Sequence, residues 1–594
     1  MRTIPVRLFD QAKKNPNGAA LFSKRGEQWV STSWEQYANR AKRVAKSLIQ
    51  LGLKPGDNTA ILGFNTEDWV VFDLGSMSAG AACAGIYTTC SPTEVQYIVH
   101  HSEARFILVE NHSQWEKIKQ ERENLPNVDR VILMTGSPDV DDEFVMTWEE
   151  FLSVGDDVED AMVQERLDAQ SLDDVATFIY TSGTTGPPKA VMLSHRNLAW
   201  TADCAVNDLG MLTTSDSTLS YLPLSHIAEQ MFSIHAPITA GYAVYFAESI
   251  QKLPDNLKEV GPTVVFGVPR IWEKFHAKVG AGLSSATGLK KLIAEWSMGV
   301  GREVTNVKNE GHEVSGLLKL KYSLANKLVF SKVKEKMGLH NARLCVTGAA
   351  PISQEILLFF AGLDVIIQEV YGQSEDTGPT SFNIQGKTRF GTVGPILPGT
   401  EVKIAEDGEI VVFGPHVFLG YFKDDAATSE ALVDGWLHTG DLGEFDPDGF
   451  LKITGRKKDI IITAGGKNIA PKNIEAAIKD CELVSQAVVI GDRRKFLSAL
   501  ITLAVEEDAA KNFAKSKGLS IEELPGSEAV REYLQNYIDE SVNPLFARVE
   551  HIRKFSILPR DFTIEANELT PTMKIKRKFV NQNWDSVIEA MYAE

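Results

Sequence analysis

Apolar residues recur at helical spacing near the start of the chain. In the segment 33–55 they follow a 4-3-4 pattern that turns one side of a helix toward a core: Tyr37, Ala41, Val44 and Leu48. Ser33 and Gln36 have the spacing of a capping box at the helix start. Gly52 and Pro55 follow its end, where both residue types are common. The pattern predicts an amphipathic helix between these signals.

Downstream, short apolar runs alternate with segments of helical periodicity. The expected strands are 58–64, 104–110, 129–134, 242–248 and 262–269. Helical patterns occupy 67–81 and 253–261. Alternation of strands and helices is typical of sheets whose strands run mostly parallel. The sequence therefore predicts an α/β fold with a large N-terminal domain of parallel or mixed sheets flanked by helices.

Two later regions depart from this alternation. Residues 280–340 have helical periodicity and few strand signals, which predicts a helical insertion. From about 392 the chain has short strand patterns and turns, and the pairs Asp407-Gly408 and Asp448-Gly449 favour hairpins. After 460 helices and strands alternate again. We expect a β-rich subdomain followed by a smaller α+β C-terminal domain, with a boundary near 455–459.

Length, charge and cysteine content narrow the function classes. A chain of 594 residues is too long for one core, so at least two domains are expected. The net charge of −18 disfavours nonspecific nucleic-acid binding, which depends on neutralising phosphates, but allows a local site for a small polyanion. The five cysteines are far apart without a CxxC pair, so neither a disulfide framework nor a zinc site is expected.

The N-terminus and the apolar segments bear on location. Residues 1–18 contain no long apolar stretch, so they do not form a signal peptide. The most apolar segments, such as 79–87, are too short to span a bilayer. We expect a reducing, cytoplasmic setting, and leave open both the oligomeric state and a peripheral association with membranes.

The segment 177–195, TFIYTSGTTGPPKAVMLSH, carries the clearest candidate chemistry. It fails the Walker A pattern G-x-x-x-x-G-K-[ST], because Pro188 replaces the second glycine and Ala190 the final hydroxyl residue. It still offers hydroxyl groups, glycine amides and the charge of Lys189 to an anion. The pattern places it between an apolar strand and a helix start, where α/β sheets bind anions. The alternative is a surface turn rich in serine, threonine and glycine.

Residues 180–195 resemble the signature loop of adenylate-forming enzymes, the superfamily of acyl-CoA synthetases, luciferases and peptide-synthetase adenylation domains. Further segments resemble this family's motifs in its order: YLPLSHIAEQ at 221–230, VTGAAPIS at 346–353, QEVYGQSEDTG at 368–378, GWLHTGDLGEFDPDGFLKITGRKKD at 435–459 and LTPTMKIKRKF at 569–579. The resemblance covers essentially the whole chain. It implies an adenylation domain at 1–455, a hinge at 456–459 and a mobile C-terminal lid domain at 460–594.

The resemblance also implies roles for single residues. Those implied to contact ATP or AMP are Thr181, Ser182, Gly183, Thr184, Thr185, Gly186, Lys189, Gly348, Ala349, Ala350, Tyr371, Gly372, Gln373, Ser374, Asp441 and Arg456. The implied catalytic residues are Lys574, His226 and Glu375, with Glu375 and Thr184 at a Mg²⁺ ion. Lys458 matches the hinge position.

Some positions depart from the family pattern or allow another interpretation. Ser374 replaces the usual threonine and keeps its hydroxyl, Met573 replaces a glycine, and Ile462 replaces a lysine that many relatives have after the hinge. His226 is alternatively a hydrogen-bonded core histidine. Lys574 in KIKRK is alternatively part of a solvated basic run.

The substrate class follows from the resemblance alone. Segments such as 86–110 and 462–475, with the helical insertion, look most like long-chain acyl-CoA synthetases, including the bubblegum-type branch. This implies ATP-dependent conversion of a fatty acid to acyl-AMP and pyrophosphate, and then transfer to CoA with release of AMP. Residues 264–272 and 348–350 are the expected walls of an apolar tunnel. A fatty acyl-AMP ligase that loads a carrier protein, a luciferase-like oxygenase and a non-catalytic lipid carrier remain alternatives.

Overall fold

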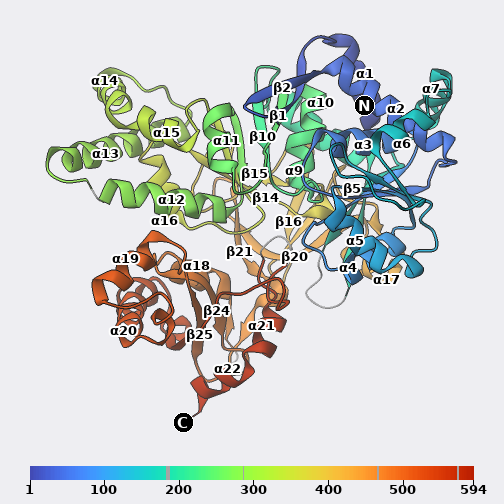
Figure 1. The fold of residues 1–594 in the computed structure, drawn as a ribbon. Helices are drawn as coiled ribbons and strands as arrows, with labels where there is room; N and C mark the ends of the chain where they lie inside the picture. The colour runs from blue at the N-terminus through green and yellow to red at the C-terminus, as the bar shows by residue number, and fades with distance from the viewer. Residues whose placement is uncertain (182–186, 285, 465–466, 571–573, 594) are drawn as a thin grey trace.

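The computed structural model describes residues 1–181, 187–284, 286–464, 467–570 and 574–593 (Figure 1). Among them, two eight-stranded sheets dominate the N-terminal part of the chain. The first has the order β15 (Ser381–Phe382), β14 (Ile367–Tyr371), β13 (Leu344–Thr347), β12 (Val264–Gly267), β10 (Ser217–Ser220), β11 (Ala243–Phe246), β1 (Ala19–Arg25), β2 (Gln28–Ser33). Its inner strands run parallel, and its edge strands β15 and β2 run antiparallel to their neighbours.

The second eight-stranded sheet has the same character. Its order is β18 (Gly420–Tyr421), β9 (Lys189–Ser194), β8 (Val175–Thr181), β4 (Ala82–Ile86), β3 (Asn58–Leu62), β5 (Ala104–Val109), β6 (Arg130–Leu133), β7 (Val145–Met146). The strands from β8 to β7 are parallel, whereas β9 and β18 are antiparallel additions at one edge. The predicted α/β class with mostly parallel sheets is confirmed.

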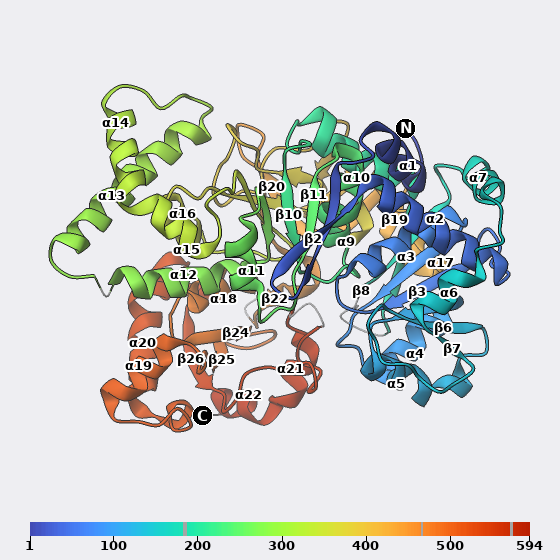
Figure 2. The same cartoon turned by 45° about the horizontal axis from the view of Figure 1, so that its top comes forward.

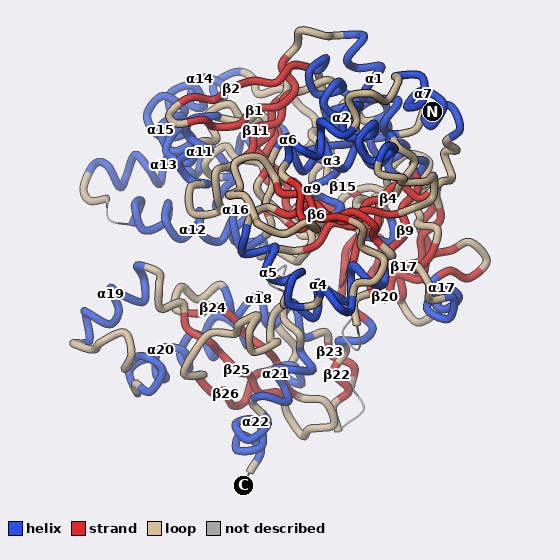
Figure 3. Tube along the Cα trace, turned by 45° about the vertical axis from the view of Figure 1, so that its right-hand side comes forward, coloured by secondary structure: helices blue, strands red, loops and turns tan. Residues whose placement is uncertain are grey.

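Helices cover both sheets and fill the space between them, as the tube view shows (Figure 3). They are α1 (Ile4–Lys14), α2 (Trp34–Gln50), α3 (Glu67–Ser78), α4 (Pro92–His101), α5 (His112–Gln120), α6 (Trp148–Val154), α7 (Asp160–Ala169), α8 (His195–Asp203), α9 (Ile227–Gln230), α10 (Ala236–Ala240), α11 (Leu253–Val260) and α16 (Gln354–Ala361). One continuous hydrophobic cluster joins the two sheets through α2, α3 and α8. Burial of this much apolar surface is the main stabilisation of the N-terminal part.

Helix α2 illustrates how local signals determine an element. The Ser33 hydroxyl accepts from the Gln36 backbone amide, and the Gln36 side chain accepts from the Ser33 amide at 2.8 Å, which completes the predicted capping box. Tyr37, Ala41 and Val44 are buried against α3 and the central cluster. The predicted helix is confirmed with its start and its buried face.

Helices occupy the region of the expected insertion, and the first of them begins earlier than residue 280. It consists of α12 (Pro269–Ser284), α13 (Leu289–Asn309), α14 (Gly316–Ala325), the π-helical turn η4 (Asn326–Phe330) and α15 (Ser331–Met337). Pro269 starts α12, because its fixed φ and missing amide suit the first helical position. The insertion forms one end of the molecule, opposite α4 and α5 (Figure 2).

A five-stranded sheet follows, in the region expected to be β-rich. Its strands are β16 (Glu401–Ile404), β17 (Glu409–Phe413), β19 (Leu432–Val433), β20 (Trp436–Phe445) and β21 (Leu451–Arg456), with α17 (Asp425–Ala431) beside them. Both predicted hairpins are present, β16–β17 around Gly408 and β20–β21 around Gly449. Each of these glycines has φ of +84°, the left-handed conformation that glycine adopts without strain.

Residues after 460 pack around cores of their own. Their elements are β22 (Ile461–Ile462), β23 (Asn468–Ile469), α18 (Pro471–Lys479), β24 (Val484–Ile490), β25 (Leu497–Leu503), α19 (Asp508–Lys517), α20 (Glu528–Tyr537), η8 (Ile538–Val542), β26 (Ile552–Ile557), α21 (Arg577–Asn583) and α22 (Asp585–Tyr592). Two hydrophobic clusters of the described residues lie wholly within this part. Polar contacts such as Lys479 Nζ to Glu273 Oε1, at 3.2 Å, connect it to α12. The proposed rotation of a lid about 456–459 stays a prediction.

Candidate active site

The phosphate-loop candidate joins two strands of one hairpin. β8 and β9 are antiparallel neighbours, and Thr181 lies opposite Lys189 where the loop leaves the sheet. The helix predicted after the segment is present, since α8 begins at His195, but strand β9 lies between the loop and this helix, which the sequence pattern did not predict. β9 lies between β8 and the edge strand β18, so it is paired on both sides. Ser182, Gly183, Thr184, Thr185 and Gly186 lie outside the described residues.

Lys189 and Glu375 lie on opposite sides of one tyrosine. The Lys189 ammonium is 4.8 Å from the ring centre of Tyr421, a cation–π contact. The Tyr421 hydroxyl donates to Glu375 Oε1 at 2.8 Å. Burial and the Glu375 carboxylate raise the pKa of Tyr421, so this hydroxyl stays a donor. Strand β18, which pairs with β9, thus sets the carboxylate beside the base of the loop.

The turn that carries Glu375 is held by close backbone approach. At Gly372, a Cβ atom would lie 1.5 Å from the Gly378 carbonyl oxygen, so only glycine fits there. The Asp376 carboxylate accepts from the Gln373 amide at 2.6 Å and from the Thr380 hydroxyl at 2.8 Å. Ser374 is buried in the short helix η5 (Ser374–Asp376) between them. These bonds fix the direction in which Glu375 leaves the turn.

Asp441 and Arg456 are direct neighbours across β20 and β21. The Arg456 Nε atom is 3.4 Å from Asp441 Oδ1, and the Tyr371 hydroxyl donates to Asp441 Oδ2 at 3.0 Å. The carboxylate is half-buried, so it keeps capacity to accept further hydrogen bonds, such as those from two hydroxyl groups of a sugar.

Lys574 comes from the C-terminal part yet faces this same group. Its pKa is lowered to about 8, first because surrounding protein excludes part of its water, and then by the positive charges of Arg456 and Lys472. The carboxylates of Asp441 and Glu375 act in the opposite direction. The residue remains exposed to solvent, so water moderates the loss of hydration and the ammonium prevails at neutral pH. Its amide donates to the Thr570 hydroxyl at 3.0 Å, which anchors the lysine next to residues 571–573, outside the described part.

His226 is a neutral imidazole at the start of α9. Its Nδ1 atom accepts from the Ala228 amide at 3.2 Å, which assigns the proton to Nε2. Burial and then the positive charge of Lys574 lower its pKa to about 3. The interpretation as a hydrogen-bonded histidine therefore holds locally, but the ring also lines a pocket, so both interpretations apply.

An apolar pocket opens from these residues into the first sheet. Its empty volume, open mouth included, is about 870 Å³. His226, Ala349, Gly372 and Gln373 line it beside the polar group described above, and its remaining lining is largely aliphatic and aromatic: Ala205, Leu209, Met211, Leu212, Ile227, Met231, Phe232, Phe266, Leu344, Val370, Phe382 and Leu397. Of the predicted tunnel walls, Phe266 and Ala349 line the pocket.

Two π-helical turns shape the pocket wall, η2 (Cys204–Asp208) after α8 and η3 (Met231–His235) after α9. Such turns insert one extra residue in a helix and are frequent at functional sites. Behind η3, the buried Glu229 carboxylate accepts from the hydroxyls of Ser220 and Ser233, at 2.7 and 2.6 Å. This anchor joins α9 and η3 to strand β10.

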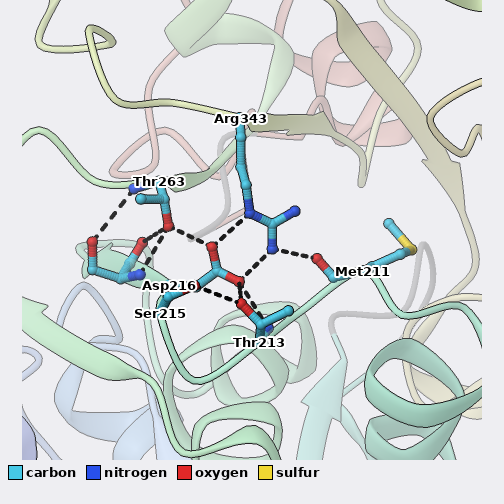
Figure 4. A network of polar contacts seen from close by, with 7 residues as sticks. Met211, Thr213, Ser215, Asp216, Thr263 and Arg343 are labelled. Atoms are coloured by element: carbon cyan, nitrogen blue, oxygen red, sulfur yellow. Dashed lines mark hydrogen bonds and ion pairs between the residues drawn. The ribbon is translucent and has the colours of Figure 1, made fainter.

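A polar network fixes the wall at Met211 and Leu212 (Figure 4). Arg343 donates through Nε to Asp216 Oδ1 at 2.7 Å and through Nη2 to the Met211 carbonyl at 2.6 Å. Asp216 also accepts from the Thr263 hydroxyl at 2.7 Å, and its pKa is lowered despite burial because Arg343 and these donors stabilise the anion. These bonds hold the pocket wall in place at Met211 and Leu212, in the segment between η2 and β10 that has no regular secondary structure.

The turn at 348–350 brings backbone close to the pocket. A Cβ atom at Gly348 would lie 2.6 Å from the Val370 side chain, so the position requires glycine. Ala349 has φ of +66°, a left-handed conformation that costs a non-glycine residue energy and is concentrated at functional sites. Ala350 is exposed beside it.

Lys458 lies in the short helix η6 (Lys457–Asp459), directly between β21 and the C-terminal part. Its neighbour Lys457 pairs with Asp407 and Glu409, at 2.5 and 3.2 Å. Lys458 itself is exposed and forms no ion pair with a described residue. The hinge role of Lys458 stays a prediction.

The donors present fit a magnesium ion that arrives with a nucleotide. Among the described residues, no three histidine, cysteine or acidic side chains form a metal-binding cluster, which argues against an all-protein cage. Glu375 offers one carboxylate oxygen beyond the one that Tyr421 contacts. Magnesium characteristically takes one or two carboxylates together with phosphate oxygens and water, and this set matches that chemistry.

Contacts and charge interactions thus connect Lys189, Glu375, Asp441, Arg456 and Lys574, and His226, which senses the charge of Lys574, lines the pocket together with Gly372. Sequence motifs did not single out Tyr421 or the walls at Met211 and Phe232. Tyr421 lies in FLGYF without a charged or glycine-rich signature, and the pocket residues differ in no way from ordinary core residues.

Family models match nearly the whole chain. A model described as AMP-binding enzyme matches residues 8–422, and one described as AMP-binding enzyme C-terminal domain matches residues 458–594.

Curated relatives align over essentially all of this chain and most of their own length. Long-chain-fatty-acid–CoA ligase ACSBG2 of Xenopus laevis is 38% identical over 100% of this chain and 84% of its own length. The human protein of the same name is 37% identical over 99% of this chain and 92% of its own length. Human ACSBG1, also named a long-chain-fatty-acid–CoA ligase, is 36% identical over 100% of this chain and 85% of its own length.

Solved structures share the fold at lower identity. The adenylation domain of a carboxylic acid reductase from Segniliparus rugosus, in complex with AMP and a carboxylic acid, has a TM-score of 0.74 at 19% identity, covering 100% of this chain and 94% of the other. The anthranilate CoA ligase AuaEII, in complex with anthranoyl-AMP, has a TM-score of 0.71 at 20% identity, covering 99% and 98%.

Proposed function

The chain belongs to the AMP-binding enzymes, the adenylate-forming family, and from this premise we propose that it is an ATP-dependent long-chain fatty acid–CoA ligase of the bubblegum type. The relatives of that name align over its full length. One observation of the structure supports the proposal: His226, Gly372 and Gln373 line an apolar pocket, and His226 also lies within reach of the charge of Lys574, a member of the polar group. The apolar pocket suits the chain of a long-chain acid, and the polar group suits a nucleotide.

In the first half-reaction, a fatty carboxylate oxygen attacks the α-phosphorus of ATP and pyrophosphate leaves. Two anions approach each other, so fixed positive charge lowers the barrier. Lys574 is the mobile cation of this step, and Lys189 with the loop at 181–189 contacts the leaving phosphates. Asp441 accepts hydrogen bonds from the ribose hydroxyls, with Arg456 beside it. The turn at 348–350 and Tyr371, Gly372, Gln373 and Ser374 form the surface for the nucleotide.

A magnesium ion, when bound with ATP, supplies further neutralisation of phosphate charge. Glu375 would hold it, and Thr184 is the second proposed ligand. The contribution of the chain itself is the orientation of Glu375, which Tyr421 and the 372–378 turn fix before the nucleotide binds.

In the second half-reaction, the CoA thiolate attacks the acyl carbonyl carbon, the thioester forms and AMP leaves with the electron pair of the broken bond. Joining the acid to AMP replaces a poor leaving group with a good one. Lys574 has no part in this step, so we propose that rotation about Lys458 removes it and admits the thiol. Residues 465–466, in the segment expected to enter the site, lie outside the described part.

Location remains part of the proposal. Among the described residues, no helix has both the length and the apolar character needed to cross a bilayer. We propose a cytoplasmic enzyme that associates peripherally with membranes, where long-chain acids concentrate.

The test measures AMP release by the purified chain with ATP, Mg²⁺, CoA and a series of acids from C2 to C24. We expect AMP and acyl-CoA in equal amounts, with the highest kcat/KM for long chains. Pyrophosphate exchange into ATP that depends on the acid, without acyl-CoA when CoA is added, would instead identify an acyl-AMP ligase that needs a carrier protein. Absence of acid-dependent exchange would exclude adenylation altogether.

A further inference from the structure

Helix α14 and the turn η4 expose a stripe of leucines. The exposed fractions are 69% for Leu317, 70% for Leu320, 50% for Leu324 and 37% for Leu328. Their spacing of three and four residues places them on one side of the helix. The opposite side, with Ala325, Val329 and Phe330, is buried against α13 and Leu363. The stripe is thus an additional apolar side that the fold leaves uncovered.

The neighbouring helix α13 has a second exposed apolar set. Leu289 is 72% exposed, Leu292 63% and Trp296 39%. Their spacing again corresponds to one side of a helix, while Ala294, Ser297 and Val300 are buried. Trp296 offers a ring with one polar atom, a side chain suited to a boundary between water and lipid. Single exposed leucines are normal on protein surfaces, but two stripes on adjacent helices indicate an interaction surface.

Lysines flank the α14 stripe. Residues 316–336 contain lysines at 319, 321, 327, 332, 334 and 336, and their only acidic residue is Glu335. On a helix of 3.6 residues per turn, Lys319 and Lys321 of α14 fall on opposite flanks of the leucines, and Lys327 and Lys332 follow in η4 and α15. This local basic density contrasts with the net charge of −18 for the whole chain.

Four of the six lysines form no ion pair with a described residue of the protein. Lys334 turns inward and pairs with the buried Asp364 at 2.6 Å. By contrast, Lys319, Lys321, Lys327 and Lys332 form no ion pair or side-chain hydrogen bond with any described residue, and the first, third and fourth are exposed. Their charges are available to an external anion.

We propose that α13, α14 and η4 form a membrane-docking surface that binds an anionic lipid bilayer. Apolar side chains on one face with flanking lysines are typical of helices that lie in the headgroup boundary. Lysines near such a surface add electrostatic attraction to anionic lipids. Their ammonium groups extend to the lipid headgroups while their methylene chains cover neighbouring apolar surface. The surface lies at an end of the molecule, so a flat bilayer can reach it without contact with the second sheet (Figures 1 and 2).

Charge favours a membrane over a second copy seated on the same face. A symmetric pair of these surfaces would bring eight uncompensated lysines together, and like charges at an interface destabilise it. The functional consequence rests on the proposed function: a docked enzyme would take its long-chain acid from the bilayer that holds it. Docking itself does not depend on that chemistry.

The test measures binding of the full chain to sedimented vesicles, without ATP, acid or CoA. Vesicles of phosphatidylcholine alone are compared with vesicles that also contain 30% phosphatidylserine, at low and physiological salt. We expect binding to the anionic vesicles that weakens with salt, and at least about tenfold weaker binding to the neutral ones, because each lysine contributes roughly a fivefold factor.

Two variants separate the contributions. Lys319→Glu with Lys327→Glu should weaken binding to anionic vesicles by at least about 30-fold. Leu317→Ser with Leu320→Ser and Leu324→Ser should weaken it by at least about tenfold. The matched controls are Lys13→Glu with Lys14→Glu on α1, both exposed, and Leu545→Ser in the C-terminal part, 69% exposed; both should bind as the unaltered chain does. Unchanged thermal unfolding verifies the fold of each variant.

Two results would overturn the proposal. One is equal binding of the unaltered chain and the α14 variants to anionic vesicles. The other is no vesicle binding together with a concentration-dependent dimer that Leu320→Ser dissociates, which would identify the surface as a contact between copies. Since no substrate is present, loss of ligase activity in another assay would leave this measurement unaffected.

Discussion

The polar side of the candidate site and its apolar pocket are built in opposite ways. The polar side takes single residues from four places: Lys189 from the loop hairpin, Glu375 from the turn after β14, Asp441 and Arg456 from the third sheet, and Lys574 from the C-terminal part. The pocket takes more than a dozen apolar side chains from η2, α9, η3, α10, the first sheet and the loops between them.

The polar side and the pocket should therefore differ in their sensitivity to single substitutions. On the polar side each charge or hydroxyl has one task at one position, so a single substitution should remove a whole step. In the pocket every side chain contributes area and shape, so substitutions should change preference among substrates and leave the chemistry intact. Tyr421 and Arg343 belong to neither type, because each positions another residue: Tyr421 holds the Glu375 carboxylate, and Arg343 holds the pocket wall at Met211.

The largest effect is expected at Lys574. Lys574→Ala should lower acid-dependent exchange of pyrophosphate into ATP by about 10²–10³-fold, the usual cost of one preorganised charge. Formation of acyl-CoA from supplied acyl-AMP should persist, since the lysine is needed in the first step alone. Equal loss of both half-reactions would contradict this role.

At the hinge, Lys458→Pro should have the opposite effect from Lys574→Ala: it should impair thioester formation and leave adenylation intact. Proline restricts the backbone where the rotation requires a change, and misplacement of a reacting group by about 1 Å can cost ~10²-fold. Adenylation should continue while thioester formation falls by about 100-fold. Lys457→Pro would be a poor control, because Lys457 pairs with the buried Glu409. Lys452→Ala serves better, because its ion pair with Glu444 in β20 is exposed to solvent. Unchanged overall turnover would refute the hinge.

In the pocket, Ala205→Phe should shorten the preferred chain. The added ring fills space at η2, and one misfitting group in an apolar pocket typically costs about 10–200-fold. kcat/KM for a C16 acid should fall by about 30-fold, with little change for a C4 acid. The exposed Ala281→Phe on α12 is the matched control. A uniform loss for all chain lengths would place Ala205 among the residues of the chemical step.

A smaller effect is expected for Tyr421→Phe. The variant keeps the ring beneath Lys189 and removes the hydroxyl that donates to Glu375. A hydrogen bond to a charged group contributes about 1.5–3 kcal/mol, so adenylation should fall by about tenfold, with a higher Mg²⁺ concentration for half-maximal rate. Tyr97→Phe, which removes the hydroxyl that donates to the Pro188 carbonyl, tests whether any nearby tyrosine has the same effect. A normal Mg²⁺ dependence in Tyr421→Phe would exclude the positioning role.

The smallest effect is a pH dependence. With its pKa lowered to about 8, the Lys574 ammonium is present below that pH and lost as pH rises through it. The adenylation rate should therefore fall about twofold from pH 7 to pH 8 and further above. Lys574→Arg, which stays charged throughout, should flatten this decline at the cost of a lower maximal rate. The same decline in the arginine variant would assign it to another group.

The sequence alone determined much of the fold, where local signals and the buried pattern agree. The capping box at Ser33, the hairpins at Gly408 and Gly449 and the alternation of strands and helices required no tertiary information, because each depends on a few adjacent residues. It also determined the family and the positions of the charged candidates, since phosphate and carboxylate chemistry restricts residue type at each position.

Other features were decided by tertiary structure. The strand β9 that separates the loop from α8 pairs with β8, so its antiparallel place depends on the sheet and not on the loop. Pocket walls such as Met211 and Phe232 have the composition of any core, and only packing left space between them. Tyr421 acquires its role because β18 pairs with β9, where Tyr421 lies opposite Val191, a residue 230 positions earlier in the chain. The leucines of α14 are exposed for the same reason: helical spacing predicts an apolar side, but the packing of neighbours decides whether anything covers it.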